Sequence, residues 1–137
     1  MKRRNFLILS ASAALAPLSA MGEPTHYLPG LVDQALADGK TVFLDFKASW
    51  CGTCKTQERV MEALKAENPA YEEAVTFFMV DWDAYRNAAI TFDLNIPRRS
   101  TLVVLKGDQE LGRIVAGTAR DEIKALMDVA LAAATGS

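Results

Sequence analysis

The chain has 137 residues, of which 50% are hydrophobic and 23% are charged, with a formal net charge of −2. This length and composition predict one globular domain that can bury a core without disulfide cross-links. Beyond the first four positions, basic residues cluster only at Arg98 and Arg99, so we expect no nucleic-acid partner.

The first 22 residues are predicted to be a secretory signal peptide rather than part of the fold. Lys2, Arg3 and Arg4 precede an apolar run over 6–16, and Pro17 introduces a stretch of small residues. The run is short and is interrupted by serines, which argues against a membrane-spanning helix. An uncleaved N-terminal anchor is the alternative interpretation.

Residues 3–7, Arg-Arg-Asn-Phe-Leu, resemble the twin-arginine export signal, and the general secretory route is the alternative. Cleavage is expected near Ala20 or Gly22. It removes three of the 15 basic residues and leaves 12 against 17 acidic ones, a net charge of −5. Export of this kind predicts a periplasmic protein, in a compartment where disulfides persist.

The stretch 23–29 is predicted to be a linker, in which His26, the only histidine of the chain, is expected to be exposed and without a role. Apolar residues at helical spacing follow Pro29 and predict a first helix, which ends at Asp38-Gly39-Lys40. The globular domain is expected to cover 30–133, followed by a tail over 134–137.

The two cysteines of the chain, Cys51 and Cys54, lie where a predicted strand gives way to a predicted helix. Residues 41–46 form an apolar, β-branched and aromatic run, as in a buried strand, and helical spacing continues from Cys54 to Asn68-Pro69. A bond between the cysteines would close too small a loop to be chiefly structural. The amino end of a helix favours a thiolate, so the pair predicts reactivity.

Strand and helix patterns continue to the C-terminus. They predict a central parallel strand over 74–80 and a helix over 81–92. A hairpin of two strands, 101–105 and 111–116, is expected next, and a last helix over 120–131. The hairpin turn is expected at Gly107-Asp108-Gln109.

This order, together with the block Trp50-Cys51-Gly52-Thr53-Cys54-Lys55 and Asp45 on the preceding strand, resembles the thioredoxin-like thiol–disulfide oxidoreductases. The resemblance implies an α/β, thioredoxin-like fold: a central mixed four-stranded sheet flanked by helices, without a distinct first strand. It also implies that no cofactor or metal is needed beyond a redox-active Cys51–Cys54 disulfide.

Position on the helix assigns the roles of the cysteines. Cys51 at the helix tip is expected to offer its sulfur to solvent and attack, and Cys54, one turn inside, to be shielded and resolve the mixed disulfide. The resemblance makes Asp45 the buried proton acceptor for Cys54, with a raised pKa. A solvent-facing Asp at the strand end is the alternative.

The other residues of the block are expected to shape the site. Trp50 resembles the tryptophan that shields the cysteines, and Gly52 and Thr53 modulate the stability of the thiolate. Thr53 stands where ordinary thioredoxin has proline, so the resemblance does not determine the reduction potential of the cysteine pair. Lys55 follows the second cysteine, as in the thioredoxin pattern.

The sequence departs from the family at the cis-proline that precedes the strand facing the cysteines. An ungapped match places Ser100 there, directly before Thr101, and an insertion would instead use Pro97. A trans Ser100 is expected to bring a hydroxyl and a backbone N–H near the sulfurs. Arg98 and Arg99 then flank the docking loop and favour a thiolate or acidic partners, unless they are simply solvated.

We therefore expect a periplasmic, monomeric protein that exchanges disulfides with other proteins through Cys51 and Cys54. Asp45 and the absence of histidine between the cysteines favour a reductase, which would draw electrons from a membrane-embedded partner. A disulfide oxidase or isomerase is the alternative. A third reading is a binding module whose two thiolates hold a soft metal such as Cu(I) or Zn(II).

Overall fold

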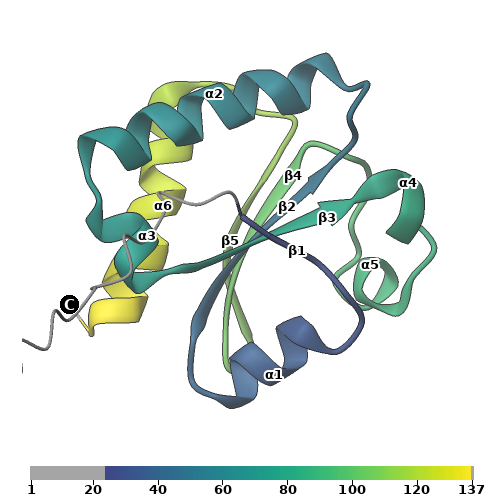
Figure 1. Ribbon diagram of the computed structural model, residues 1–137, viewed down its shortest axis with the longest axis horizontal. Coiled ribbons are helices and arrows are strands. Elements are labelled where there is room, and N and C mark those ends of the chain that lie inside the picture. Colours follow the sequence, from purple (N-terminus) through teal and green to yellow (C-terminus); the bar gives the residue numbers. More distant parts are fainter. Residues whose placement is uncertain (1–23, 137) are drawn as a thin grey trace, which may run out of the picture.

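The computed structural model describes residues 24–136 of the chain (Figure 1). The predicted signal peptide and its cleavage site lie outside the described residues, as do Glu23 and Ser137. Within the described part of the chain, no helix is long and apolar enough to span a membrane.

Strands and helices alternate along most of the described chain. The strands are β1 (Thr25–His26), β2 (Thr41–Lys47), β3 (Thr76–Asp81), β4 (Thr101–Lys106) and β5 (Gln109–Val115). The helices are α1 (Leu31–Ala37), α2 (Gly52–Glu67), α3 (Ala70–Ala74), α4 (Trp82–Tyr85), α5 (Ala89–Asp93) and α6 (Arg120–Thr135).

The strands form one mixed sheet in the order β1-β3-β2-β4-β5. β1, β3 and β2 run parallel, whereas β4 is antiparallel to both β2 and β5. The mixed α/β thioredoxin-like fold is confirmed, but the described sheet has five strands rather than four. The additional strand, β1, lies in the predicted linker, where the N–H of Tyr27 also bonds to the carbonyl of Met79 at 2.8 Å.

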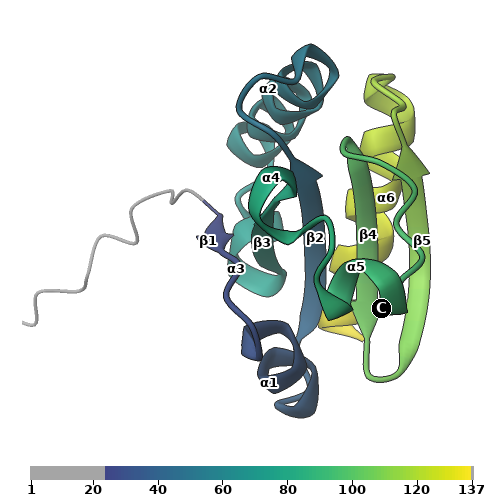
Figure 2. The same ribbon diagram turned by 90° about the vertical axis from the view of Figure 1, so that its right-hand side faces the viewer.

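Helices cover both faces of the sheet and bury one apolar cluster on each (Figures 1 and 2). On one face, α1, α4 and α5 pack over side chains such as Val42, Leu44 and Phe46. On the other face, α2, α3 and α6 pack over Phe43 and its neighbours. The alternation along β2 follows from the pleat of a strand, which points successive side chains to opposite faces. The resulting structure has three layers.

Three helical segments differ from the sequence prediction. The helix predicted over 81–92 is divided into α4 and α5 because Ala88 has an extended backbone, with ψ of 161°, and the hydroxyl of Thr91 donates to the carbonyl of Tyr85 at 2.7 Å. The predicted stop at Asn68-Pro69 is followed by α3, where Asn68 Oδ1 accepts the N–H of Ala70 at 3.2 Å. The last helix continues to Thr135, into the predicted tail.

Sheet register brings two distant loops together. Phe46, near the end of β2, pairs with Thr101 at the start of the antiparallel neighbour β4. The chain that leaves β2 toward the cysteines therefore lies beside the chain that enters β4 through Arg98, Arg99 and Ser100. Any chemistry of the cysteine pair takes place against this second loop.

Candidate active site

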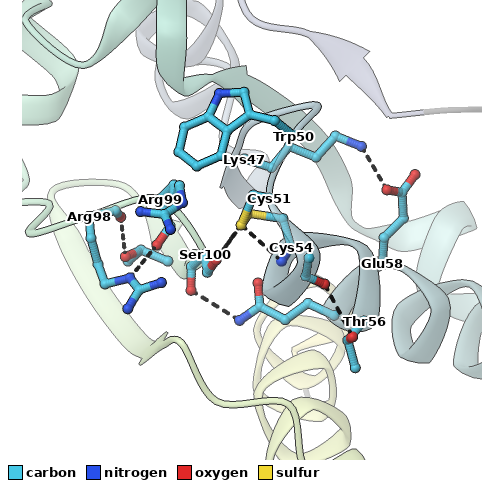
Figure 3. Close-up of a disulfide and its surroundings, with 12 residues drawn as sticks. Lys47, Trp50, Cys51, Cys54, Thr56, Glu58, Arg98, Arg99 and Ser100 are labelled. Atoms are coloured by element: carbon cyan, nitrogen blue, oxygen red, sulfur yellow. Dashed lines mark hydrogen bonds and ion pairs between the residues drawn. A yellow bond between two sulfur atoms is a disulfide. The ribbon is translucent and has the colours of Figure 1, made fainter.

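Cys51 and Cys54 form a disulfide at the amino end of α2, with their Cα atoms 5.3 Å apart (Figure 3). Cys51 is the N-cap of this 16-residue helix, and its Sγ accepts the backbone N–H of Cys54 at 3.2 Å. One orphan donor of the first helical turn therefore points at the Cys51 sulfur. Together with the helix dipole, this donor stabilises negative charge on Cys51.

Both cysteines are buried, which corrects the expectation of a solvent-exposed Cys51. Cys51 is 2% exposed and Cys54 1%, so exposure does not distinguish attacker from resolver in the oxidised protein. The two pack with Ala48 and with Trp82, which begins α4. Trp82 was predicted only as part of a helix, and its contact with the cysteines depends on how α4 folds back.

Trp50 lies differently from the shield that the family resemblance implied. Its side chain is 58% exposed, and its indole N–H donates to both carboxylate oxygens of Asp83, at 3.1 and 2.9 Å. The guanidinium of Arg99 lies over the ring, 4.5 Å from its centroid. Trp50 therefore links α4 to the loop before β4, and Arg99 and Trp50 form a stacked pair at the surface (Figure 3).

Ser100 faces the disulfide, as the ungapped match predicted. Its Oγ lies 3.1 Å from Cys51 Sγ and 3.0 Å from Cys54 Sγ, and the residue is fully buried. No peptide bond is cis within residues 24–136, and Ser100 has a positive φ of 63°. Its backbone N–H does not point to the sulfurs as expected, because it donates to the carbonyl of Phe46 at 2.7 Å.

The loop before β4 is held by its own hydrogen bonds. Thr101 Oγ1 donates to the carbonyl of Arg98 at 2.7 Å, and Arg98 Nε donates to the carbonyl of Arg99 at 3.0 Å. Neither arginine forms an ion pair with a carboxylate in the described part of the chain. Two half-buried cations therefore lie beside the disulfide without a counter-ion among residues 24–136.

Gln57 is a site residue that the sequence analysis missed. It is fully buried on α2, and its Nε2 donates to the carbonyls of Ser100 at 3.0 Å and Gly117 at 2.9 Å. The helix of the cysteines is thereby joined to both loops that surround it. The sequence did contain a signal for such a role. Gln57 is a polar residue on the buried helix stripe that carries Cys54, Met61 and Leu64, where a polar side chain needs buried hydrogen-bond partners.

Asp45 is buried in β2 and is only 6% exposed. Strand alternation places its side chain on the α2 face of the sheet, between Phe43 and Lys47, and Lys47 forms an ion pair with Glu58 of α2 at 3.0 Å. Its Oδ1 has no hydrogen-bond partner among the described residues.

Burial raises the pKa of Asp45 to about 7, against the opposing charge of Lys47 and with added repulsion from Glu58. The solvent-facing alternative for this residue does not hold. A carboxyl with this pKa can take up and release a proton near neutrality.

The remaining predicted residues lie on the first turn of α2. Gly52 and Lys55 are exposed and Thr53 is partly buried. Among the residues that the structure describes, no group of three or more His, Cys, Asp or Glu side chains is placed to hold a metal ion. The two cysteines alone supply half of the four ligands that a tetrahedral thiolate site requires.

A redox disulfide at the amino end of a helix, preceded by a strand with a buried carboxyl of raised pKa, defines a thiol–disulfide oxidoreductase of thioredoxin-like fold. The model of the family described as Thioredoxin matches residues 31–129. The chain belongs to the thioredoxin family.

The curated relatives that the chain matches are thioredoxins. The chain is 36% identical to thioredoxin H2-1 of Oryza sativa subsp. japonica over 85 residues, which cover 62% of this chain and 56% of that protein. It is 38% identical to a thioredoxin of Chlamydia muridarum over 87 residues, covering 63% of this chain and 78% of that one. The match thus spans only about half the length of the rice relative.

Solved structures agree with this assignment. The crystal structure of Trxlp from Edwardsiella tarda superimposes with a TM-score of 0.65 at 30% identity, covering 76% of this chain and 98% of that one. Thioredoxin of Malassezia sympodialis gives a TM-score of 0.67 at 27% identity, covering 80% and 92%.

Proposed function

We propose that the protein is a periplasmic protein-disulfide reductase in which Cys51 attacks and Cys54 resolves. The observation that carries this proposal is the placement of the Cys51–Cys54 disulfide at the amino end of α2, with Asp45 buried on the strand that leads into it. The first feature favours a nucleophilic thiolate, and the second supplies a proton acceptor.

Catalysis begins with the reduced dithiol. The Cys51 thiolate attacks one sulfur of a substrate disulfide, so a Cys51–substrate bond forms and the substrate S–S bond breaks. The electron pair leaves on the other substrate sulfur, which takes up a proton. The helix dipole and the Cys54 N–H, 3.2 Å from Cys51 Sγ, favour Cys51 over Cys54 as the attacking thiolate.

Asp45 acts in the second half of the reaction. The carboxylate accepts the proton of Cys54, and the Cys54 thiolate attacks Cys51 Sγ. The Cys51–Cys54 disulfide forms, and the second substrate sulfur leaves as a thiolate. Because the pKa of Asp45 is about 7, the carboxyl is partly ionised at neutral pH and can fill this role.

The location and the electron source rest on the leader. Its basic start, apolar run and small residues support export to the periplasm. A soluble reductase there needs two electrons for each turnover, and a membrane-embedded dithiol donor would supply them. The monomeric state expected from the sequence is part of the same proposal.

Arg98 and Arg99 are proposed to contact the substrate. Both lie in the loop that faces the cysteines, and neither has a carboxylate partner in residues 24–136. Positive charge beside the site attracts substrates whose reactive cysteine is flanked by acidic residues. The exposed ring of Trp50, held by Arg99, adds an apolar surface to this contact.

The direction of electron flow is tested by the reduction potential of the Cys51–Cys54 couple, measured against glutathione or dithiothreitol buffers. A reductase is expected near the value of thioredoxin, about −270 mV, and insulin disulfides should be reduced in the presence of a dithiol donor. Cys51→Ser is the inactive control. A potential near −120 mV, the range of strong oxidants, would overturn the reductase proposal.

A disulfide isomerase or oxidase is the second candidate. It is favoured by the Ser100 hydroxyl, because a donor 3.1 Å from Cys51 Sγ stabilises a thiolate and so favours the reduced protein. A potential above about −180 mV together with reactivation of scrambled ribonuclease would support this candidate.

A further inference from the structure

Three hydrogen bonds fix the backbone of Ser100, although the residue lies in a loop. Its N–H donates to the carbonyl of Phe46, and its own carbonyl accepts from Ala116 N at 2.8 Å and Gln57 Nε2 at 3.0 Å. The backbone has a φ of 63°, which a non-glycine residue seldom adopts. Three hydrogen bonds thus keep Ser100 in a conformation that costs free energy, as is common at functional sites.

The hydroxyl of Ser100 has two polar neighbours among the described residues, and both are cysteine sulfurs. Its Oγ lies 3.0 Å from Cys54 and 3.1 Å from Cys51, in a position that solvent does not reach. A hydroxyl carries one hydrogen, so it can donate to one sulfur at a time. Rotation of that hydrogen moves the hydrogen bond from one cysteine sulfur to the other without movement of the backbone.

The strength of this bond depends on the redox state. A disulfide sulfur is a weak acceptor, whereas a bond to an ionised group is roughly twice as strong as one between neutral groups. Burial strengthens the difference, since Ser100 is fully buried and water does not compete for its hydroxyl. The hydroxyl therefore stabilises whichever state places negative charge on a sulfur in front of it.

We propose that Ser100 is a catalytic residue whose hydroxyl donates to the Cys51 thiolate in the reduced protein and to the Cys54 thiolate in the mixed disulfide. When Cys51 becomes bonded to the substrate, it loses its charge and the hydroxyl turns to Cys54. The developing Cys54 thiolate receives the hydrogen bond as its proton leaves. Attack on Cys51 Sγ then returns both sulfurs to the disulfide.

This inference uses the thiol–disulfide exchange of the family and holds for either direction of electron flow. It predicts that loss of the hydroxyl disfavours the reduced protein and slows the resolving step. A proline at this position has no hydroxyl, so it could neither stabilise the reduced protein in this way nor assist the resolving step.

The test compares Ser100→Gly and Ser100→Ala in the full mature chain. Glycine accepts a φ of 63° without strain, whereas alanine keeps the strain, so the two variants differ in stability while both lack the hydroxyl. Thiolate absorbance at 240 nm is followed against pH, and the dithiol–disulfide equilibrium is measured against glutathione. The decay of a Cys51–peptide mixed disulfide is measured by rapid quenching.

Both variants are expected to raise the pH midpoint of the thiolate absorbance by about one unit and to lower the equilibrium constant for reduction about tenfold, equivalent to about 30 mV. Resolution should slow at least tenfold in both. Thr56→Val, which removes a hydroxyl bonded to the carbonyl of Gly52, is the control and should retain wild-type values.

Values within twofold of the wild type in both variants would overturn the proposal. An effect in Ser100→Gly that is absent from Ser100→Ala would also overturn it, because the effect would then follow the release of backbone strain rather than the loss of the hydroxyl. The wild-type potential separately decides between reductase and oxidase, so failure of the proposed direction is distinguishable from failure of the Ser100 assignment.

Discussion

The side-chain amide of Gln57 donates to the backbone carbonyl of Ser100 at 3.0 Å, which joins the helix of the cysteines to the loop that faces them. The same nitrogen also donates to Gly117 at 2.9 Å, so one buried amide fixes the relative position of three segments. The distance between the sulfurs and the Ser100 hydroxyl depends on this connection.

Replacing Gln57 by leucine removes both bonds and leaves the carbonyl of Gly117 without this buried donor. An unsatisfied buried acceptor costs about 1–3 kcal/mol. Loss of Gln57 Oε1, which has no hydrogen-bond partner within the described part of the chain, offsets part of that cost. We expect the free energy of unfolding, measured by urea denaturation of the oxidised protein, to fall by about 1–2 kcal/mol. Gln34→Leu, at an exposed position of α1, is the matched control. Equal losses in the two variants would contradict the role of Gln57.

The pKa of Asp45 predicts a pH-dependent stability. Because the folded-state pKa is raised from about 4 to about 7, the native protein keeps a proton that the unfolded chain releases between these values. The stabilising contribution of protonated Asp45 is therefore lost as pH rises from about 4 to 7, with an upper bound of about 4 kcal/mol.

Denaturation midpoints at several pH values check this sign. Relative to Asp45→Asn, the wild type should lose stability as pH rises through this window and then level off above pH 7. Asp93→Asn, at an exposed position of α5, should retain the wild-type pH dependence. A difference between wild type and Asp45→Asn that stays constant from pH 4 to 8 would show that the carboxyl is not protonated in the folded protein.

The assignment of attacker and resolver predicts different behaviour for the two serine variants. Cys54→Ser keeps the thiolate at the N-cap of α2 and should accumulate a stable mixed disulfide with a disulfide-bonded peptide. Cys51→Ser leaves only the sulfur inside the first turn and should form at least tenfold less adduct, as seen by mass spectrometry under non-reducing conditions. Equal trapping by both variants would refute the assignment.

Charge beside the site predicts a preference among substrates. Replacing Arg98 and Arg99 together by glutamine should lower the rate with an acidic disulfide peptide about five- to tenfold and weaken its salt dependence, with little change for a neutral peptide. Arg59→Gln with Arg86→Gln makes the same charge change at exposed positions outside the loop. If both pairs slow the acidic peptide equally, net charge rather than the loop sets the preference.

Local patterns in the sequence predicted most of the fold. Residues 41–46 predicted β2, and the apolar stripe from Arg120 predicted α6. The Gly107-Asp108-Gln109 connection predicted the hairpin of β4 and β5, although Gln109 already belongs to β5. Each of these signals depends on neighbours in the chain, through strand alternation, turn chemistry or helical spacing. The position of the cysteines at the amino end of a helix is a local property of the same kind.

Tertiary structure decided what surrounds the cysteines. β1 has only two residues, too few to form a pattern, and exists because β3 offers an edge for pairing. Gln57 meets residues 43 and 60 positions away in sequence, and Trp50 meets Asp83 from 33 positions away. Such contacts depend on how whole elements pack, so no short window of sequence contains them.

The cysteine pair at the amino end of a helix was thus determined by the sequence alone, whereas the choice of Ser100 over Pro97 as the residue opposite it was decided by the structure. The burial of Cys51, the orientation of Trp50 and the direction of the Ser100 N–H were decided by packing. The physical reason is that the reactivity of the cysteines depends first on residue type and on position in the helix, which are local. The groups that alter the stability of each thiolate come from distant elements that only the fold brings together.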